Sequence, residues 1–221
     1  MSEADIIRTI TVYLIPVLFA ISLHEAAHGY TALYFGDDTA KREGRLSLNP
    51  IRHIDLFGTI ILPLVLGVAG LPPFGYAKPV PVDFGRLRNP KKQMAFVAAA
   101  GPAANFAMGL GWMILLVVLN AMGADEFFIQ MAKGGVSVNS AMCVFNLIPI
   151  PPLDGGRIVT GLLPLHLARP FASIERHGMW VFIALVLLMQ LGILQGPLLA
   201  GMHLVQSIFY TVVSPLISIL S

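Results

Sequence analysis

The chain alternates long apolar blocks with short polar connections rich in proline and glycine. The first block, residues 9–35, has 27 positions and one acid, Glu25. At about 1.5 Å per residue a helix of this length spans about 40 Å, more than the apolar core of a bilayer. Blocks 94–122, 180–193 and 198–220 are similarly apolar. Each block is therefore predicted to form a membrane helix.

Three further stretches break the simple pattern. Residues 58–70 are apolar but number only 13, which favours a re-entrant segment over a full crossing. Residues 76–83 contain Pro79 and Pro81. Because a residue before proline avoids the helical region, this stretch is predicted to be extended, and an ordinary proline-rich loop is the alternative. Residues 123–135 are predicted as a short loop. Residues 136–156 enter the membrane again as a helix that must break at Pro149, Pro151 and Pro152.

These elements predict an all-α polytopic membrane protein with about five transmembrane helices and a re-entrant segment with short extended strands. Composition agrees, because 56% of the residues are hydrophobic, only 12% are charged and the mean hydropathy is +0.78, whereas soluble domains carry about 25% charge. The net charge of +2 is too small and dispersed to favour nucleic acid. The single cysteine, Cys143, excludes an internal disulfide.

The distribution of charge predicts an orientation. If residues 58–70 dip into the membrane and return, the basic residues between 41 and 92 share one side with Arg157, Arg169 and Arg176. The N-terminus and loop 123–135 then lie on the other side. The positive-inside rule places the basic side in the cytoplasm and the N-terminus outside it. Because Glu3 and Asp5 replace the basic start of a signal peptide, the first block is expected to remain as a helix.

The first apolar block contains the sequence HEAAH, with His24, Glu25 and His28. On a helix the two histidines lie about 40° apart and one turn from each other, so both imidazoles can bind one Zn²⁺. Glu25 lies close enough to take a proton from a zinc-bound water. An ionisable group at this depth costs several kcal/mol unless it is used or paired. The alternative is a polar cluster that joins helices.

A catalytic zinc usually has three protein ligands and a water. The proline-interrupted segment 145–158 supplies one carboxylate, Asp154, at its end. Irregular backbone at membrane depth is tolerated where it lines a polar cavity. Asp154 is therefore the candidate third ligand, and a helix cap before Gly155 and Gly156 is the alternative for its role.

Because it contains both HEAAH and the later segment that ends in Asp154, the chain resembles the site-2 protease family of intramembrane zinc metalloproteases. That family pairs HExxH in one membrane helix with Asn-x-x-Pro and Leu-Asp-Gly in a later one, matched here by Asn146, Pro149 and Leu153-Asp154-Gly155. The stretches GRLSLNPIRHID, YAKPVPVDFGRLRNP and AAAGPAANF are typical of its compact bacterial branch. Larger members insert a PDZ domain where this chain has only residues 123–135, so no PDZ domain is expected.

The resemblance implies one Zn²⁺ per chain held by His24, His28 and Asp154, with Glu25 as general base and Asn146 holding the substrate backbone or the oxyanion. It also implies a catalytic membrane core at 1–165, followed by a C-terminal helical pair at 166–221. His53 is interpreted as structural or as a partner of a ligand, and Asn105 as a hydrogen-bond link between helices.

The predicted function is that of an intramembrane zinc endopeptidase of the bacterial inner (cytoplasmic) membrane. Its substrates would be transmembrane segments of other proteins, cut near the cytoplasmic face. The alternative is a non-proteolytic membrane protein that binds zinc or helices, although a pure binding protein has no use for Glu25 beside the metal. A metal transporter would need ionisable groups spread along several helices. The sequence names no particular substrate, cleavage bond, trigger or oligomeric state.

Overall fold

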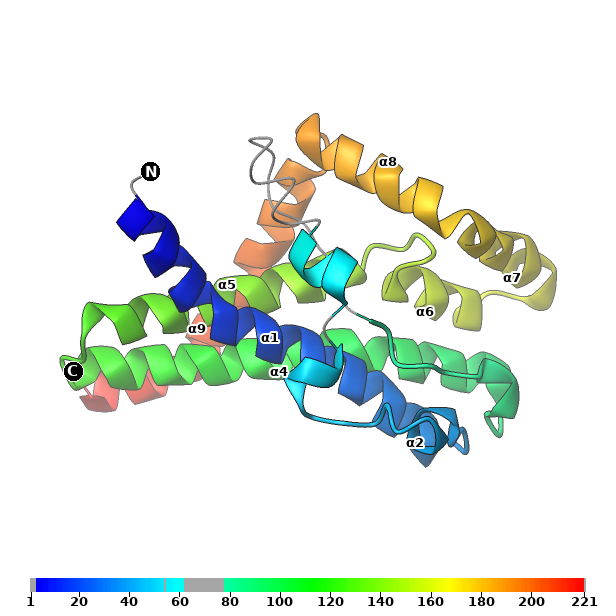
Figure 1. Ribbon diagram of the computed structural model, residues 1–221, viewed down its shortest axis with the longest axis horizontal. Coiled ribbons are helices and arrows are strands. Elements are labelled where there is room, and N and C mark those ends of the chain that lie inside the picture. The colour runs from blue at the N-terminus through cyan, green and yellow to red at the C-terminus, as the bar shows by residue number, and fades with distance from the viewer. Residues whose placement is uncertain (1–2, 54, 62–77, 221) are drawn as a thin grey trace.

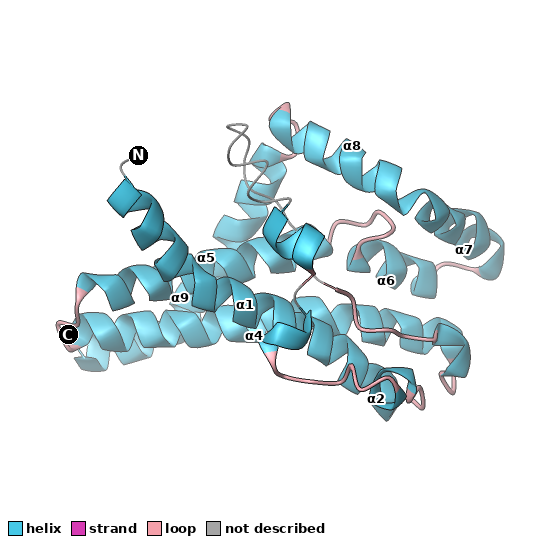
Figure 2. Ribbon diagram, viewed as in Figure 1, coloured by secondary structure: helices cyan, strands magenta, loops and turns pink. Residues whose placement is uncertain are grey.

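The computed structural model describes residues 3–53, 55–61 and 78–220, and the regular elements within these ranges are all helices (Figure 2). The longer helices are α1 (Glu3–Tyr34), α4 (Pro90–Ala121), α5 (Glu126–Asn146), α6 (Asp154–Leu162), α7 (Leu165–Ala172), α8 (Gly178–Gln190) and α9 (Gln195–Leu220). Shorter elements are α2 (Thr39–Arg42), the 3₁₀ turns η1 (Pro50–His53), η3 (Phe84–Arg86) and η4 (Ser173–His177), and the π-helix η2 (Leu56–Ile61).

Helix α4 is the centre of the fold, because it packs against α1, α5, α6 and α9 (Figure 1). Small residues make this close packing possible. A Cβ added to Gly109 would lie 2.7 Å from the ring of Phe209 of α9, and one added to Gly135 of α5 would lie 2.2 Å from the ring of Trp112. Phe209 is fully buried there. Small residues therefore let these helices approach each other closely.

The outer surfaces of the long helices are apolar. On α1, for example, Ile10, Leu14 and Phe19 are 45–54% exposed. By length and composition, four described segments are able to cross a membrane: Ile10–Tyr34, Pro90–Ala121, Leu165–Gln190 and Gln195–Leu220. Large apolar side chains on such surfaces are stable in lipid and costly in water. The chain is a multi-pass membrane protein, although the predicted count of five spans is not confirmed.

The predicted helices 9–35 and 94–122 correspond to α1 and α4. The predicted loop 123–135 was wrong over most of its length, because α5 already begins at Glu126. Asp125 caps this helix by accepting a hydrogen bond from the Phe127 N–H at 2.8 Å. Only Met122–Asp125 connect α4 to α5, so no domain is inserted between these two helices.

The predicted re-entrant segment and strands are not confirmed. Residues 58–61 belong to the π-helix η2, and residues 62–77 lie outside the described part of the chain. The described remainder of the predicted extended piece, residues 78–83, runs without regular secondary structure. It lies against α1, where Val80 is 6% exposed. A Cβ added to Gly29 of α1 would meet the Val80 side chain at 2.9 Å.

Candidate metal centre

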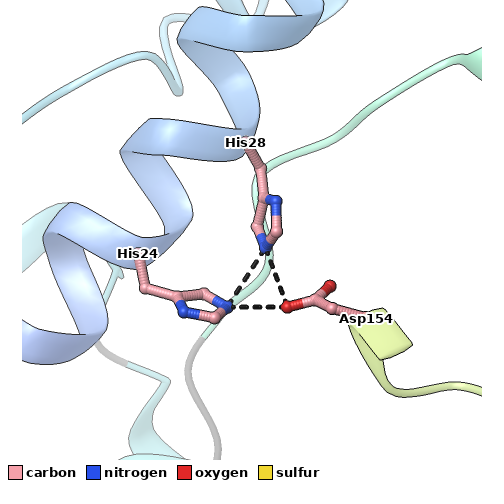
Figure 3. A group of neighbouring side chains, drawn as sticks. All are labelled: His24, His28 and Asp154. Carbon is pink, nitrogen blue, oxygen red and sulfur yellow. Dashed lines mark hydrogen bonds and ion pairs between the residues drawn. The ribbon is translucent and has the colours of Figure 1, made fainter. Parts of the chain in front are cut away.

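Two helices far apart in the sequence bring three ligand atoms together. His24 and His28 project from consecutive turns of α1, and Asp154 is the first residue of α6 (Figure 3). The two Nε2 atoms are 3.1 Å apart, and Asp154 Oδ2 lies 3.1 Å from His24 Nε2 and 3.3 Å from His28 Nε2. The three side chains are only 6%, 12% and 7% exposed. They form a nearly equilateral triangle shielded from solvent.

The triangle has the size that zinc requires. With bonds of about 2.0–2.1 Å, two ligands of a tetrahedral zinc ion lie about 3.3–3.4 Å apart. Asp154 Oδ2 is buried and accepts no hydrogen bond from the residues that the structure describes, which is costly for a carboxylate oxygen unless a cation faces it. On α4, a Cβ added to Gly101 would lie 2.5 Å from both Nε2 atoms. The missing side chain of Gly101 therefore leaves space beside the two nitrogens for an ion.

The sequence after α5 explains how Asp154 reaches this place. Helix α5 ends at Asn146, and residues 147–153 fold back so that α6 starts against them. A Cβ added to Gly155 would lie 2.3 Å from the Leu147 carbonyl oxygen, and one added to Gly156 would lie 2.2 Å from Pro151 N. Only glycine permits this approach, which directs Asp154 toward α1.

Helix α4 holds the other nitrogen of each imidazole. His28 Nδ1 lies 2.7 Å from the Val97 carbonyl oxygen, and His24 Nδ1 lies 2.5 Å from Asn105 Oδ1. Neither oxygen can donate a proton, so each Nδ1 carries the hydrogen and each Nε2 is left with its lone pair. Both histidines are therefore in the tautomer that binds a metal through Nε2.

Glu25 is half-buried and lies next to the triangle in sequence rather than in it. Its Oε2 accepts a hydrogen bond from the Val80 N–H at 2.8 Å. The residues around Val80 are held from one end by Arg45, whose guanidinium donates to the carbonyls of Lys78 and Pro79 at 3.3 and 3.4 Å. The arrangement fixes the Glu25 carboxylate beside the backbone of this segment.

Asp37 holds the other end of this segment. It accepts hydrogen bonds from the Asp83 N–H at 2.8 Å, the Thr39 N–H at 3.0 Å and the Thr39 hydroxyl at 2.5 Å. Burial alone would raise the pKa of Asp37, but these hydrogen bonds and the charge of Arg86 outweigh it and lower the pKa below its usual value. Asp37 is therefore a charged anchor at the end of α1.

The remaining predicted residues are placed differently. The Asn146 amide donates to the Met142 carbonyl of its own helix at 3.0 Å, so its role toward substrate stays a prediction. The side chain of His53 lies outside what the structure describes. Asn105 donates to the Ala20 carbonyl of α1 and to Asn139 of α5, which confirms the predicted link between helices.

Sequence reasoning missed Val97, Gly101 and Asn139 as neighbours of the centre. The sequence signal for the two α4 residues is that Val97, Gly101 and Asn105 are spaced four residues apart, which puts them on one face of α4. A backbone carbonyl and an absent side chain leave no mark in a sequence pattern. These contacts became visible only when α4 was placed against α1.

A buried zinc-sized triangle inside an apolar helical bundle, with the carboxylate of Glu25 next to His24 on the same helix, is the arrangement expected of a membrane zinc metalloprotease. Comparisons with known proteins agree. The model of "Peptidase family M50" matches residues 121–191. "Putative zinc metalloprotease YwhC" of Bacillus subtilis is 36% identical over 214 residues, which are 92% of this chain and 93% of that protein. The chain belongs to peptidase family M50, the site-2 protease family.

A more distant relative is also named a putative zinc metalloprotease. Rip2 of Mycolicibacterium smegmatis is 30% identical over 177 residues, which are 77% of this chain and 64% of that protein. No solved structure matches the chain. Family membership confirms the expectation of zinc and of a metalloprotease in a membrane.

Proposed function

We propose that this protein is an intramembrane zinc endopeptidase that hydrolyses peptide bonds in transmembrane segments of other membrane proteins near the cytoplasmic face. The observation that carries the proposal is the buried triangle of His24, His28 and Asp154 with Glu25 beside it. Water and a peptide bond must both reach this place for hydrolysis, and the bilayer around it restricts the substrate to chains that lie in the membrane.

In this proposal His24, His28 and Asp154 hold one Zn²⁺. When bound there, zinc lowers the pKa of its water toward about 7 and polarises the scissile carbonyl. Glu25 accepts the proton of the attacking water and passes it to the nitrogen of the leaving amine. The hydrogen bond from the Val80 N–H holds Oε2 of the Glu25 carboxylate, and its other oxygen is proposed to take this proton.

Asn146 is proposed to hold the substrate backbone or the developing oxyanion. Its amide now donates to the Met142 carbonyl, one turn earlier on α5. Asn146 is half-buried and is the last residue of α5, directly before the fold-back that leads to Asp154. A change of its side-chain rotamer exchanges the Met142 carbonyl for a substrate group without a change in the helix.

A transmembrane helix resists cleavage because its backbone groups are bonded to one another, so it must unwind locally before it reacts. Residues 78–83 are proposed to receive the unwound substrate as an added strand. The support is their position, since Val80 of this segment touches Glu25 and both ends are held, by Arg45 and Asp37.

The proposal also includes the arrangement in the membrane. Residues 1–165 form the catalytic core and residues 166–221 a helical pair, in a bacterial inner (cytoplasmic) membrane with the N-terminus outside the cytoplasm. The excess of basic residues between 41 and 92 supports this orientation. Ser47→Cys and Lys133→Cys test it, since labelling of both from the same side of intact cells overturns it.

The function is tested with purified protein in detergent and in bilayers, on a panel of transmembrane peptides. Wild type should contain one zinc per chain and cut panel members, and a chelator should abolish cleavage. Glu25→Gln should keep its zinc and lose cleavage, because the base is gone while the ligands stay. Glu43→Gln, the same change at an exposed glutamate of the C-cap of α2, is the matched control. Zinc-loaded wild type that cuts no panel member in bilayers would favour a non-proteolytic zinc-binding or helix-binding protein.

A further inference from the structure

A chain of amides connects the metal centre to two backbone carbonyls. Asn105 Oδ1 lies 2.5 Å from His24 Nδ1, and Asn105 Nδ2 donates to the Ala20 carbonyl at 3.1 Å and to Asn139 Oδ1 at 3.0 Å. Asn139 Nδ2 in turn donates to the Gly135 carbonyl at 2.9 Å. Both asparagine side chains are completely buried. Helices α1, α4 and α5 thus meet at one polar network in an apolar core.

The two carbonyls determine how both amides are oriented. A backbone carbonyl only accepts, so the group facing Gly135 O must be the NH₂ of Asn139, and Asn139 Oδ1 then faces Asn105. For the same reason the group facing Ala20 O must be the NH₂ of Asn105. Its two donors are then both used, and only its oxygen remains for His24 Nδ1. A flipped Asn105 would place a donor against a donor and an acceptor against two acceptors.

We propose that Asn105 is the positioning residue of the metal centre, and that Asn139 holds the Asn105 amide in the orientation that keeps His24 Nε2 free for zinc. This inference rests on the proposed function, since it takes His24 as a zinc ligand. Partners of this kind orient a ligating histidine and typically contribute a factor of 10–100 to metal affinity. A neutral amide does so here without adding a buried charge.

The test measures zinc dissociation constants by competition with a chelator, and the visible spectrum of the Co²⁺-loaded protein, on chains purified in detergent. Asn105→Leu should raise the zinc dissociation constant about 10- to 100-fold and change the cobalt spectrum. Asn105→Asp keeps an acceptor toward His24 Nδ1 and should bind zinc more tightly than Asn105→Leu. Equal losses for the two variants, or a dissociation constant of Asn105→Leu within twofold of wild type, would overturn the proposal.

Asn139 is tested through a double-variant cycle. Asn139→Leu should raise the zinc dissociation constant less than Asn105→Leu does, and the double variant should be no worse than Asn105→Leu alone, because Asn139 acts only through Asn105. Independent, additive effects contradict this. If Asn105→Leu does not fold, the zinc affinities of Asn139→Leu and Asn105→Asp still decide the matter, and wild-type values for both overturn it.

Two controls separate the possible failures. Ser140→Ala removes a completely buried hydroxyl next to Asn139 that donates to the Val136 carbonyl of its own helix, so it should leave zinc affinity unchanged. A purely structural network would lower the melting temperature of the metal-free protein without changing zinc affinity. His24→Ala should abolish zinc binding. If it does not, the proposed ligand set is wrong, whereas loss in His24→Ala beside normal affinity in Asn105→Leu refutes the positioning role alone.

Discussion

Gly101→Ala is expected to block the metal centre with a single methyl group. The added Cβ would lie 2.5 Å from the Nε2 atoms of both His24 and His28, whereas ordinary contacts of a Cβ begin at 3.4 Å. Two imidazoles held at Nδ1 by the same helix cannot both move aside easily, because Val97 and Asn105 fix them on either side of Gly101. The methyl carbon therefore competes for the volume in which zinc binds.

The magnitude follows from the displacement needed. Helix α4 or the imidazoles must shift by about 0.9 Å, and a misplacement of about 1 Å in a catalytic site costs about 100-fold. We expect the rate of cleavage of transmembrane peptides to fall by at least that factor, which corresponds to about 2.7 kcal/mol. Zinc titration of the detergent-purified variant should show a weaker affinity in parallel, because the methyl group occupies the volume of the ion.

Gly111→Ala is the matched control for this prediction. Gly111 lies on the same helix, and a Cβ added there meets no atom of the described part of the chain within 4 Å. Both substitutions gain about 0.5–1 kcal/mol of helix propensity, so a difference between them reports the site and not the helix. Wild-type zinc affinity in a folded Gly101→Ala protein would refute the placement of the metal between α1, α4 and α6.

Three further results are expected. Val80→Pro removes the N–H that donates a hydrogen bond to Glu25 and should lower kcat at least about tenfold at unchanged zinc affinity. This loss is part of the roughly 10²–10⁴-fold rate increase that a positioned base contributes. Val80→Ala keeps the N–H and should keep most of the activity. The pKa of Asp37 is lowered in the folded protein, so the charged side chain stabilises the fold. This stabilisation is fully present above about pH 4 and is lost as the pH falls through the pKa of Asp37 in the folded protein. Acid unfolding followed by circular dichroism should show this dependence in wild type and a weaker one in Asp37→Asn; equal curves contradict it. A chelator should lower the melting temperature of wild type but not of His24→Ala, since zinc stabilises only the folded chain, and an unmoved wild type would speak against a bound metal.

The membrane gave the HEAAH motif much of its predictive value. In a soluble protein five residues of this kind are a modest signal, but in a helix with an otherwise apolar sequence each ionisable group needs a purpose. The same argument selected Asp154, about 125 positions later, from the few acids in the chain. The structure places the two stretches in contact, with 3.1 Å between His24 Nε2 and Asp154 Oδ2.

Sequence reasoning failed in two places, one for a local reason and one for a tertiary reason. The polar residues after Gly123 suggested a loop, yet Glu126, Gln130 and Lys133 are good helix formers and α5 begins with them once Asp125 caps it. The first turns of α5 are polar because they emerge from the helical bundle, so their polarity does not indicate a loop. The hydrogen bond from Val80 to Glu25 was beyond prediction, because it depends on how the backbone of residues 78–83 packs against α1.

The sequence by itself determined the membrane character, the long helices and the residue types of a zinc site, because hydrophobic length, helical spacing and the cost of buried charge are properties of short stretches. Only the tertiary structure decided which groups surround that site. The Val97 carbonyl, the open face of Gly101 and the amides of Asn105 and Asn139 act through position alone. Their effect on His24 and His28 arises from the packing of α4 between α1 and α5, which no local pattern encodes.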